Sequence, residues 1–207
     1  MALKSARMAG LTVPDGHFEG ALAFARWVSR EDGLAGYIDP KGAGAKVSGP
    51  DDQYDYHPSG MSALSMCIRA FAAHDLEDPF LEPASKRLLA DLPNVSKDRL
   101  SVDYYYWYYG SLALFQFDGP DSPRARGNVW SAWNKAMQKA VLDLQERGKG
   151  CGEGGWLVPD RWSHSGGPIY ATALNVLTLE VYYRYANAFS VARKRAGSEV
   201  QPTQGTR

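Results

Sequence analysis

The stretch DYYYWYYGSLALFQF, residues 103–117, decides the fold of this chain. It begins with Asp103, a residue type that caps helix starts, and six consecutive aromatic residues follow. A glycine and an uncharged apolar run complete it. A helix with this sequence is apolar on every side, so we expect it to lie in the interior with other helices around it.

The composition fits one soluble globular domain. The 207 residues are 44% hydrophobic and 22% charged, with a formal net charge of zero. The absence of a basic stripe argues against nucleic acid as a partner. The two cysteines, Cys67 and Cys151, are too far apart in the sequence to suggest a disulfide framework or a metal-binding pair.

The sequence also contains no membrane or export signal. No uncharged run reaches the roughly 18 residues of a transmembrane segment. The first ten residues, MALKSARMAG, lack the apolar core of a secretion signal. A cytoplasmic location is therefore expected for the chain as written.

Apolar periodicity predicts about seven helices joined by glycine- and proline-rich turns. They cover Ala2–Ala9, His17–Ser29, Met61–Ala73, Pro79–Asp91, Tyr104–Phe117, Val129–Glu146 and Ile169–Ala188. Residues 38–59 are predicted as a surface loop, and the charged tail 189–207 is predicted to be disordered. One domain, residues 1–188, is expected.

Nearly all-apolar helices alternate with amphipathic ones along the chain. The apolar helices are Ala2–Ala9, Met61–Ala73, Tyr104–Phe117 and Ile169–Tyr182, and each contains an Ala-Leu pair. These pairs recur at a spacing of roughly 50 to 60 residues, as in repeat proteins. The alternation predicts an inner and an outer layer of helices.

One glycine-rich turn resembles a known repeat. KAVLDLQERGKGCGEGGW, residues 139–156, resembles the QW repeat of squalene and hopene cyclases, in which a helix ends in Gln and a glycine-rich turn leads to Trp. The corresponding residues here are Gln145, Gly155 and Trp156. A Gln amide near a helix end can satisfy free backbone groups, while the Trp ring covers the turn, so a structural role is expected for both.

The resemblance extends over most of residues 1–188. ALAFARWVSREDGLAGY, residues 21–37, looks like a degenerate copy, with Ser29 or Arg30 in place of Gln and Tyr37 in place of Trp. The aromatic stretch, WSAWNKAM and GGPIYATALNVLTLEVYYRY are similar to the C-terminal part of bacterial squalene-cyclase-like proteins with prenyltransferase-type repeats.

This resemblance implies an all-α fold, an α/α toroid in which outer helices surround inner ones. About seven helices make an incomplete ring, so we expect the chain to be part of a longer protein whose compartment the sequence leaves open. Helix faces left uncovered by an incomplete ring predict self-association or a protein partner.

The resemblance also points to residues that would line a ligand cavity. Cyclase cavities are lined by aromatic side chains whose π faces stabilise carbocations. The candidate ligand-binding residues are Tyr104, Tyr105, Trp107, Tyr108, Tyr170 and Glu180. Core packing is the alternative for the aromatic residues, and an i,i+4 ion pair with Arg184 is the alternative for Glu180.

Four motifs of related chemistry are missing or incomplete. The chain has no DxDD acid of the hopene-cyclase type. Asp51, Asp52 and Asp55 spell the DDxxD pattern that holds Mg²⁺ and a diphosphate, but they lie in a predicted loop, so a chance match is favoured. Neither cysteine has the Asp two residues earlier that the zinc site of protein prenyltransferases needs. In GCGEG, Gly154 stands where the thioester motif of complement-type toroids needs Gln.

No metal or cofactor is therefore expected, and two functions stay open. The first is a non-catalytic toroid module that binds a protein partner or a hydrophobic or isoprenoid ligand. The second is a terpenoid cyclase-type isomerase acting on a polyprenyl or squalene-like substrate, with catalytic residues still unidentified. The missing acid favours the first. A wide tyrosine-lined cavity would favour the isomerase. A cavity filled by its own side chains would favour the binding module.

Overall fold

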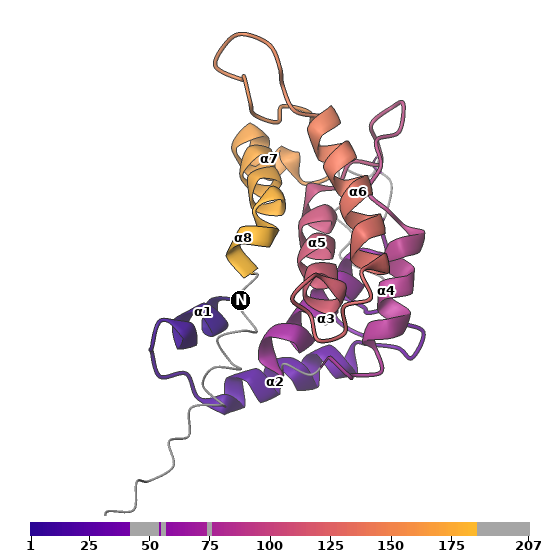
Figure 1. Cartoon of the computed structure of the whole chain (residues 1–207), viewed down its shortest axis with the longest axis vertical. Coiled ribbons are helices and arrows are strands. Elements are labelled where there is room, and N and C mark those ends of the chain that lie inside the picture. Colours follow the sequence, from indigo (N-terminus) through magenta and orange to yellow (C-terminus); the bar gives the residue numbers. More distant parts are fainter. Residues whose placement is uncertain (42–53, 55–56, 74–75, 186–207) are drawn as a thin grey trace, which may run out of the picture.

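The computed structural model describes residues 1–41, 54, 57–73 and 76–185, and these residues form an all-α fold (Figure 1). The helices are α1 (Ala2–Met8), α2 (Asp15–Trp27), α3 (Ser59–Ala72), α4 (Leu81–Ala90), α5 (Tyr104–Asp118), α6 (Asn128–Asp143), α7 (Ser163–Leu179) and α8 (Val181–Tyr185). Within this part of the chain the β pairing is limited to an isolated bridge between Ser29 and Ala35. The expected all-α class is confirmed.

Each of the seven predicted helices is present, and the last is divided. The predicted helix from Ile169 onward starts earlier, at Ser163, and breaks at Glu180 into α7 and α8. The first turn of α7 is kinked where Gly167 adopts a positive φ of 57°, just before Pro168. Proline lacks a backbone N–H, so the regular part of α7 effectively begins there.

Helix α5 is the centre of the fold, as its sequence predicts. The carboxylate of Asp103 caps it by accepting a 2.8 Å hydrogen bond from the Tyr106 backbone N–H. Every residue of α5 is buried except Tyr105 and Tyr109, which are half-buried. Figure 1 shows α5 between α6 and α4 on one side and α7 and α8 on the other.

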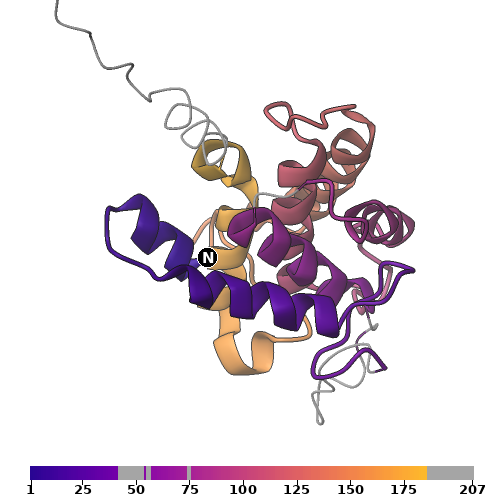
Figure 2. The ribbon, with the colours of Figure 1, turned by 90° about the horizontal axis from the view of Figure 1, so that it is seen from below.

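The helices pack in two rows around α5. In the first row α3 packs against α5, and α5 packs against α7. In the second row α2 and α4 pack on α3, α6 packs on α5, and α4 also contacts α6. Seen from below, α2 runs along the lower face and α1 projects beside it (Figure 2). Two rows fit the expected inner and outer layers; closure into a toroid stays a prediction.

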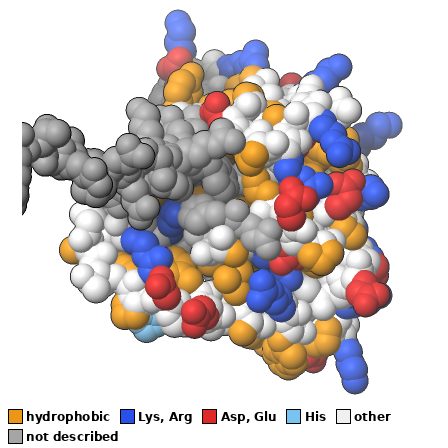
Figure 3. All heavy atoms as spheres, turned by 60° about the horizontal axis from the view of Figure 1, so that its bottom comes forward, with side chains coloured by type: hydrophobic (Ala, Val, Ile, Leu, Met, Phe, Trp, Pro, Cys, Tyr) orange, Lys and Arg blue, Asp and Glu red, His pale blue; other side chains and the backbone are white. Residues whose placement is uncertain are grey.

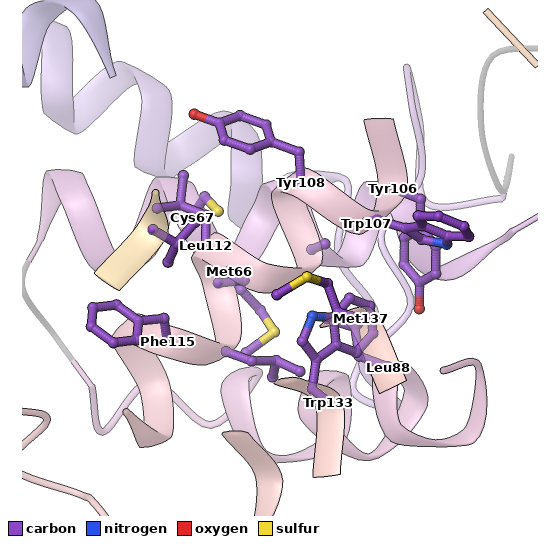
Figure 4. Packing of buried hydrophobic residues seen from close by; sticks show 14 of the residues in the cluster. Met66, Cys67, Leu88, Tyr106, Trp107, Tyr108, Leu112, Phe115, Trp133 and Met137 are labelled. Carbon is purple, nitrogen blue, oxygen red and sulfur yellow. The ribbon is translucent and has the colours of Figure 1, made fainter. Parts of the chain in front are cut away.

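The core lies between the two rows. Figure 4 shows Met66 and Cys67 of α3, Leu88 of α4, and Trp133 and Met137 of α6 meeting the aromatic and leucine side chains of α5. Burial of Trp133 and Met137 is complete, with 0% of each residue exposed. These contacts fill the space between the rows with side chains of the chain itself.

The prediction that all apolar helices are buried is wrong for the first and only partly right for the last. No residue of α1 is buried. In α7 the buried residues are Ala171, Asn175 and Thr178, whereas Ile169 is 85% exposed. Helix α1 belongs to neither row and projects beside α2, and α7 packs against α5 and α8, so much of the apolar surface of both helices is not buried.

Some predictions fall on residues outside the described part. The DDxxD match, Asp51, Asp52 and Asp55, lies there, and so does the tail 189–207 that was predicted to be disordered. The domain limit at residue 188 also lies outside it. The structure does not test these predictions.

Candidate functional site

An apolar hollow of about 230 Å³ lies between α1, α2 and α3, and we call it the α1–α3 pocket. The side chain of Tyr109, one of the two half-buried residues of α5, forms part of its wall. Its lining residues are Met1, Leu3, Lys4, Phe18, Ala21, Leu64, Cys67, Ile68, Phe71, Ala72 and Tyr109. Among the described residues, the lining contains no carboxylate.

The wall formed by α3 follows from helical spacing. Leu64, Ile68 and Phe71 recur at intervals of four and three residues, which places them on one face of the helix. Cys67 lies on the same side, and burial raises the pKa of its thiol to about 12. A thiol with that pKa stays protonated at neutral pH, so Cys67 packs as a small apolar group, as its place in an apolar helix predicts.

The opposite wall of the pocket is formed by α1. Leu3 is 43% exposed, so this helix covers the hollow without being locked into the core. Lys4 is the charged member of the lining. Burial lowers the pKa of Lys4, and the neighbouring Arg7 lowers it further.

Three of the predicted ligand-binding residues are core residues in this structure. Tyr104 and Trp107 have 0% of their surface exposed, and Tyr108 has 6%. The hydroxyl of Tyr104 donates to the Val158 carbonyl at 3.1 Å, and the Tyr104 ring meets Trp107 edge-on at 5.6 Å. These rings pack in the interior among their own neighbours.

The other three predicted residues retain exposed surface but do not form one cluster with the pocket. Tyr105 lies 4.6 Å from Tyr109 and 5.9 Å from Trp162, measured between ring centroids. Tyr170 is half-buried and donates its hydroxyl to Asp160. Glu180 is half-buried at the break between α7 and α8. Their role in binding stays a prediction, and Phe18 and Phe71 are aromatic lining residues that the sequence did not single out as ligand-binding.

Apart from the pocket, a cluster of polar contacts surrounds Asp160 where α5 and α7 begin. Its Oδ1 accepts from the Trp162 backbone N–H at 3.1 Å and from the Ser163 hydroxyl at 2.6 Å. Its Oδ2 accepts from the Tyr104 backbone N–H at 2.9 Å and from the Tyr170 hydroxyl at 3.3 Å. One carboxylate thus ties the first turns of two helices together.

Asp160 and Asp103 both hold their protons more tightly than usual. Asp160 is 1% exposed, and its burial, with the negative charge of Asp103 nearby, raises its pKa to about 6. Burial also raises the pKa of Asp103. The sequence analysis did not single out Asp160, because this residue lies in a segment that reads as a loop.

The QW-like turn has the geometry expected for a structural role. The side-chain amide of Gln145 donates to the Gly154 carbonyl at 2.9 Å. The indole N–H of Trp156 donates to the Val141 carbonyl near the end of α6 at 2.8 Å, and Trp156 is 2% exposed. The ring therefore seals the end of α6.

The degenerate copy of this turn differs. Tyr37 is 53% exposed and so does not seal its turn as Trp156 does. Instead, Ser29 donates its hydroxyl to the Ala25 carbonyl at 2.6 Å, and backbone pairing with residues 34–36 closes the turn.

Neither a metal cluster nor a membrane span is found within the described residues. No three His, Cys, Asp or Glu side chains gather there in a way that could hold a metal ion. No helix in that part of the chain has the length and apolarity needed to cross a bilayer. Cys151 is exposed in the glycine-rich turn, beside an open hollow lined by Leu157, Ile169 and Thr172 among others.

Comparisons with protein-family models, with curated proteins and with solved structures gave no match. The resemblance to squalene-cyclase-like proteins therefore stays an expectation from the sequence motifs.

Proposed function

We propose that this chain belongs to a squalene-cyclase-like α/α toroid and acts as a non-catalytic module that binds a hydrophobic ligand in the α1–α3 pocket. The observation that carries the proposal is the pocket itself, about 230 Å³ in volume and apolar except for Lys4. Ligand sites are commonly apolar hollows with few polar groups. This volume lies below the range of drug-sized sites, so it suits a small terpenoid or one end of a longer isoprenoid chain.

The toroid assignment is supported by two features. The inner row α3, α5 and α7 is flanked by an outer row of amphipathic helices. The Gln145 and Trp156 hydrogen bonds close the turn after α6 in the way that the QW motif suggests. Both features are expected in a complete toroid and in an incomplete one.

The non-catalytic assignment is supported by the surroundings of the aromatic helix. Tyr104, Trp107 and Tyr108 are packed in the core, which matches the cavity filled by its own side chains that favours a binding module. The part of the α1–α3 lining that the structure describes offers no carboxylate to protonate a substrate, and the Cys67 thiol in it has a pKa of about 12.

One observation favours the alternative, a cyclase-type isomerase. Asp160 has a pKa near 6, and a carboxyl group that keeps its proton near neutral pH is suited to general acid catalysis. Against this, both oxygens of Asp160 accept hydrogen bonds from four donors, two of them backbone N–H groups, and only 1% of the residue is exposed. A capping role accounts for those contacts.

The ligand proposal is tested by co-purification and by blocking the pocket. Native mass spectrometry with lipid extraction of the purified chain is expected to reveal an apolar ligand. The neutral fluorescent probe N-phenyl-1-naphthylamine is expected to bind saturably at one site. Ala21→Trp fills the pocket and should abolish that binding, while Ala23→Trp, on an exposed position of the same helix, should leave it intact.

Two outcomes would overturn the ligand proposal. The first is an empty chain that shows no saturable probe binding. The second is binding that survives Ala21→Trp unchanged. Incubation with squalene separates the alternative, because a cyclised product that disappears in Asp160→Asn would identify an enzyme rather than a binding module.

Self-association is a second proposal, supported by an exposed aromatic pair on α2. Phe24 and Trp27 are 48% and 58% exposed, with ring centroids 5.9 Å apart. Tyr37 and Ile38, in the turn that follows, are also exposed. The face shown in Figure 3 carries hydrophobic side chains between acidic and basic ones. Light scattering should show that the wild-type chain is an oligomer and that the double variant Phe24→Ser/Trp27→Ser is a monomer. A soluble wild-type monomer would refute self-association.

A further inference from the structure

The imidazole of His57 is held between two oxygen atoms just before α3. Its Nδ1 lies 3.0 Å from Oδ1 of Asp91, at the end of α4. Its Nε2 lies 3.1 Å from the carbonyl oxygen of Ser101, two residues before the cap of α5. The side chain is 7% exposed. One ring therefore connects the starts of α3 and α5 with the end of α4.

Both of these partners accept hydrogen bonds. A backbone carbonyl has no proton to give, and an ionised carboxylate has none either. A neutral imidazole carries one N–H, so it can donate to only one of the two. The doubly protonated, positively charged ring donates to both, and this is the form that the geometry around His57 fits.

The titratable neighbours of His57 favour the charged ring. Asp91 contacts it from the end of α4, and Asp103 lies nearby at the start of α5. Tyr106 stacks on the ring at 5.0 Å and donates its hydroxyl to the Asp91 carbonyl at 2.8 Å. The positive charge of Arg161, in the segment before α7, lowers the pKa of Asp103 and so favours its ionised form. Burial alone lowers the pKa of His57, but the Asp91 hydrogen bond and the two carboxylate charges outweigh it, and the pKa is raised.

The segment that the ring holds makes its polar contacts largely within itself, while Leu92, Val95 and Val102 pack at its two ends and in its middle against the core. The Ser96 backbone N–H donates to the Ser101 hydroxyl at 2.8 Å, and the Ser101 backbone N–H donates to the Ser96 hydroxyl at 3.2 Å. The Ser101 hydroxyl donates to the Asn94 carbonyl at 2.9 Å. Arg99 adopts a positive φ of 63°, which a non-glycine residue adopts at some cost. The hydrogen bond from His57 joins this closed loop to the start of α3.

We propose that His57 is a pH-operated clamp: in its protonated form it fastens the loop of residues 94–101 to the start of α3, and its deprotonation loosens that attachment. Loss of the proton removes one of the two hydrogen bonds. It also turns a ring lone pair toward the Asp91 carboxylate or the Ser101 carbonyl, which is repulsive. The clamp is independent of the α1–α3 pocket, since no residue is shared between them.

Nitrogen-15 NMR of the histidine rings in the wild-type chain tests the charge directly. At pH 6 the two ring nitrogens of His57 should both carry protons. Their titration midpoint should lie above 6.5, the ordinary value for histidine. In Asp91→Asn the midpoint should fall below that of the wild type. A neutral His57 ring at pH 6 in the wild-type chain would overturn the proposal.

Amide hydrogen exchange tests the release of the loop. Protection factors of residues 94–101, corrected for the pH dependence of the intrinsic exchange rate, should drop in the wild type when the pH rises through the His57 midpoint. In His57→Gln they should be low at every pH, while His17→Gln, which removes an exposed ring on α2, should behave as the wild type does. Unchanged protection across the midpoint in a folded wild-type chain would refute the release.

Discussion

Gly110 of α5 lies directly against the indole ring of Trp133 of α6. A Cβ atom on Gly110 would stand 2.3 Å from Cζ2 and 2.5 Å from Cη2 of that ring. The indole N–H donates to the Ser111 hydroxyl at 2.9 Å, which fixes the ring in place. The glycine that follows the six aromatic residues therefore lies where the central helix and its outer neighbour approach too closely for a Cβ atom.

Gly110→Ala is expected to destabilise the fold although alanine favours helices. The change gains about 1 kcal/mol of helix propensity, but forcing a methyl group into the ring costs about 1–3 kcal/mol or more because both partners are buried. Urea unfolding should show a lower midpoint. Gly20→Ala on α2, where nothing lies within 4 Å, is the control and should be neutral or stabilising.

Asp118, at the end of α5, caps the start of α6 across a nine-residue connection. Its Oδ1 accepts from the backbone N–H groups of Arg126 and Gly127, and its Oδ2 from those of Val129 and Trp130, all within 3.0 Å. Asp118→Ala leaves these donors unpaired and should cost about 3 kcal/mol of unfolding free energy. Asp118→Asn keeps one accepting oxygen and should cost less. Equal costs for the two variants would contradict this role.

The same carboxylate makes stability depend on acid pH. Burial on its own raises the pKa of Asp118, but the four backbone hydrogen bonds outweigh it and hold the pKa below its usual value of 3.8. A lowered pKa means that the stabilisation is fully present above about 3.8 and is lost as the pH falls through the folded-state value. The stability gap between wild type and Asp118→Asn should therefore be constant above pH 5 and shrink below pH 4. A gap that is independent of pH would show that Asp118 is not ionised.

Local sequence patterns predicted the helices well because their causes are local. The cap on α5 follows from Asp103 and the residues after it, and the turn after α6 follows from the Gln145 and Trp156 spacing. The caps made by Asp118 and Asp160 depend on chain segments meeting in space, so spacing alone revealed neither of them.

The candidate site was harder to foresee for a related reason. In a run of six aromatic residues every position has the same character, so periodicity cannot tell which rings face outward. The structure leaves Tyr105 and Tyr109 half-buried and places the four between and before them in the core. The sequence also did not predict that α1 forms a wall of the pocket. Its apolar sequence reads as an inner helix, whereas in the structure α1 covers the hollow from outside.

The glycine-rich turn after α6 should lose stability when its tryptophan loses its hydrogen bond. Trp156→Phe keeps an aromatic ring but removes the 2.8 Å bond to the Val141 carbonyl and some buried volume, at a cost of about 2 kcal/mol. Gln145 is half-buried, so Gln145→Ala should cost about 1 kcal/mol or less. Guanidinium unfolding checks both values. A larger loss in Gln145→Ala than in Trp156→Phe would mean that the amide, not the ring, closes the turn.

The buried ion pair between Arg69 of α3 and Asp78 is expected to be the most sensitive polar contact in the fold. Arg69 is 2% exposed, its Nε donates to Asp78 Oδ2 at 3.0 Å, and its guanidinium lies 4.2 Å from the centre of the Phe80 ring. Its other nitrogens donate to Ser65 and Ser29. Removing one partner leaves the other as an unpaired charge in a low-dielectric interior.

Arg69→Met should therefore cost about 3–5 kcal/mol, measured by urea unfolding at neutral pH. Lys139→Met is the matched control, since it removes a cation from the exposed pair with Asp143 and should cost less than about 1 kcal/mol. Adding Asp78→Ala to Arg69→Met should recover part of the loss, because the unpaired carboxylate is then gone. The cost of Asp78→Ala alone is measured as well. If the losses of the two single variants simply add up in the double variant, the two charges are not coupled.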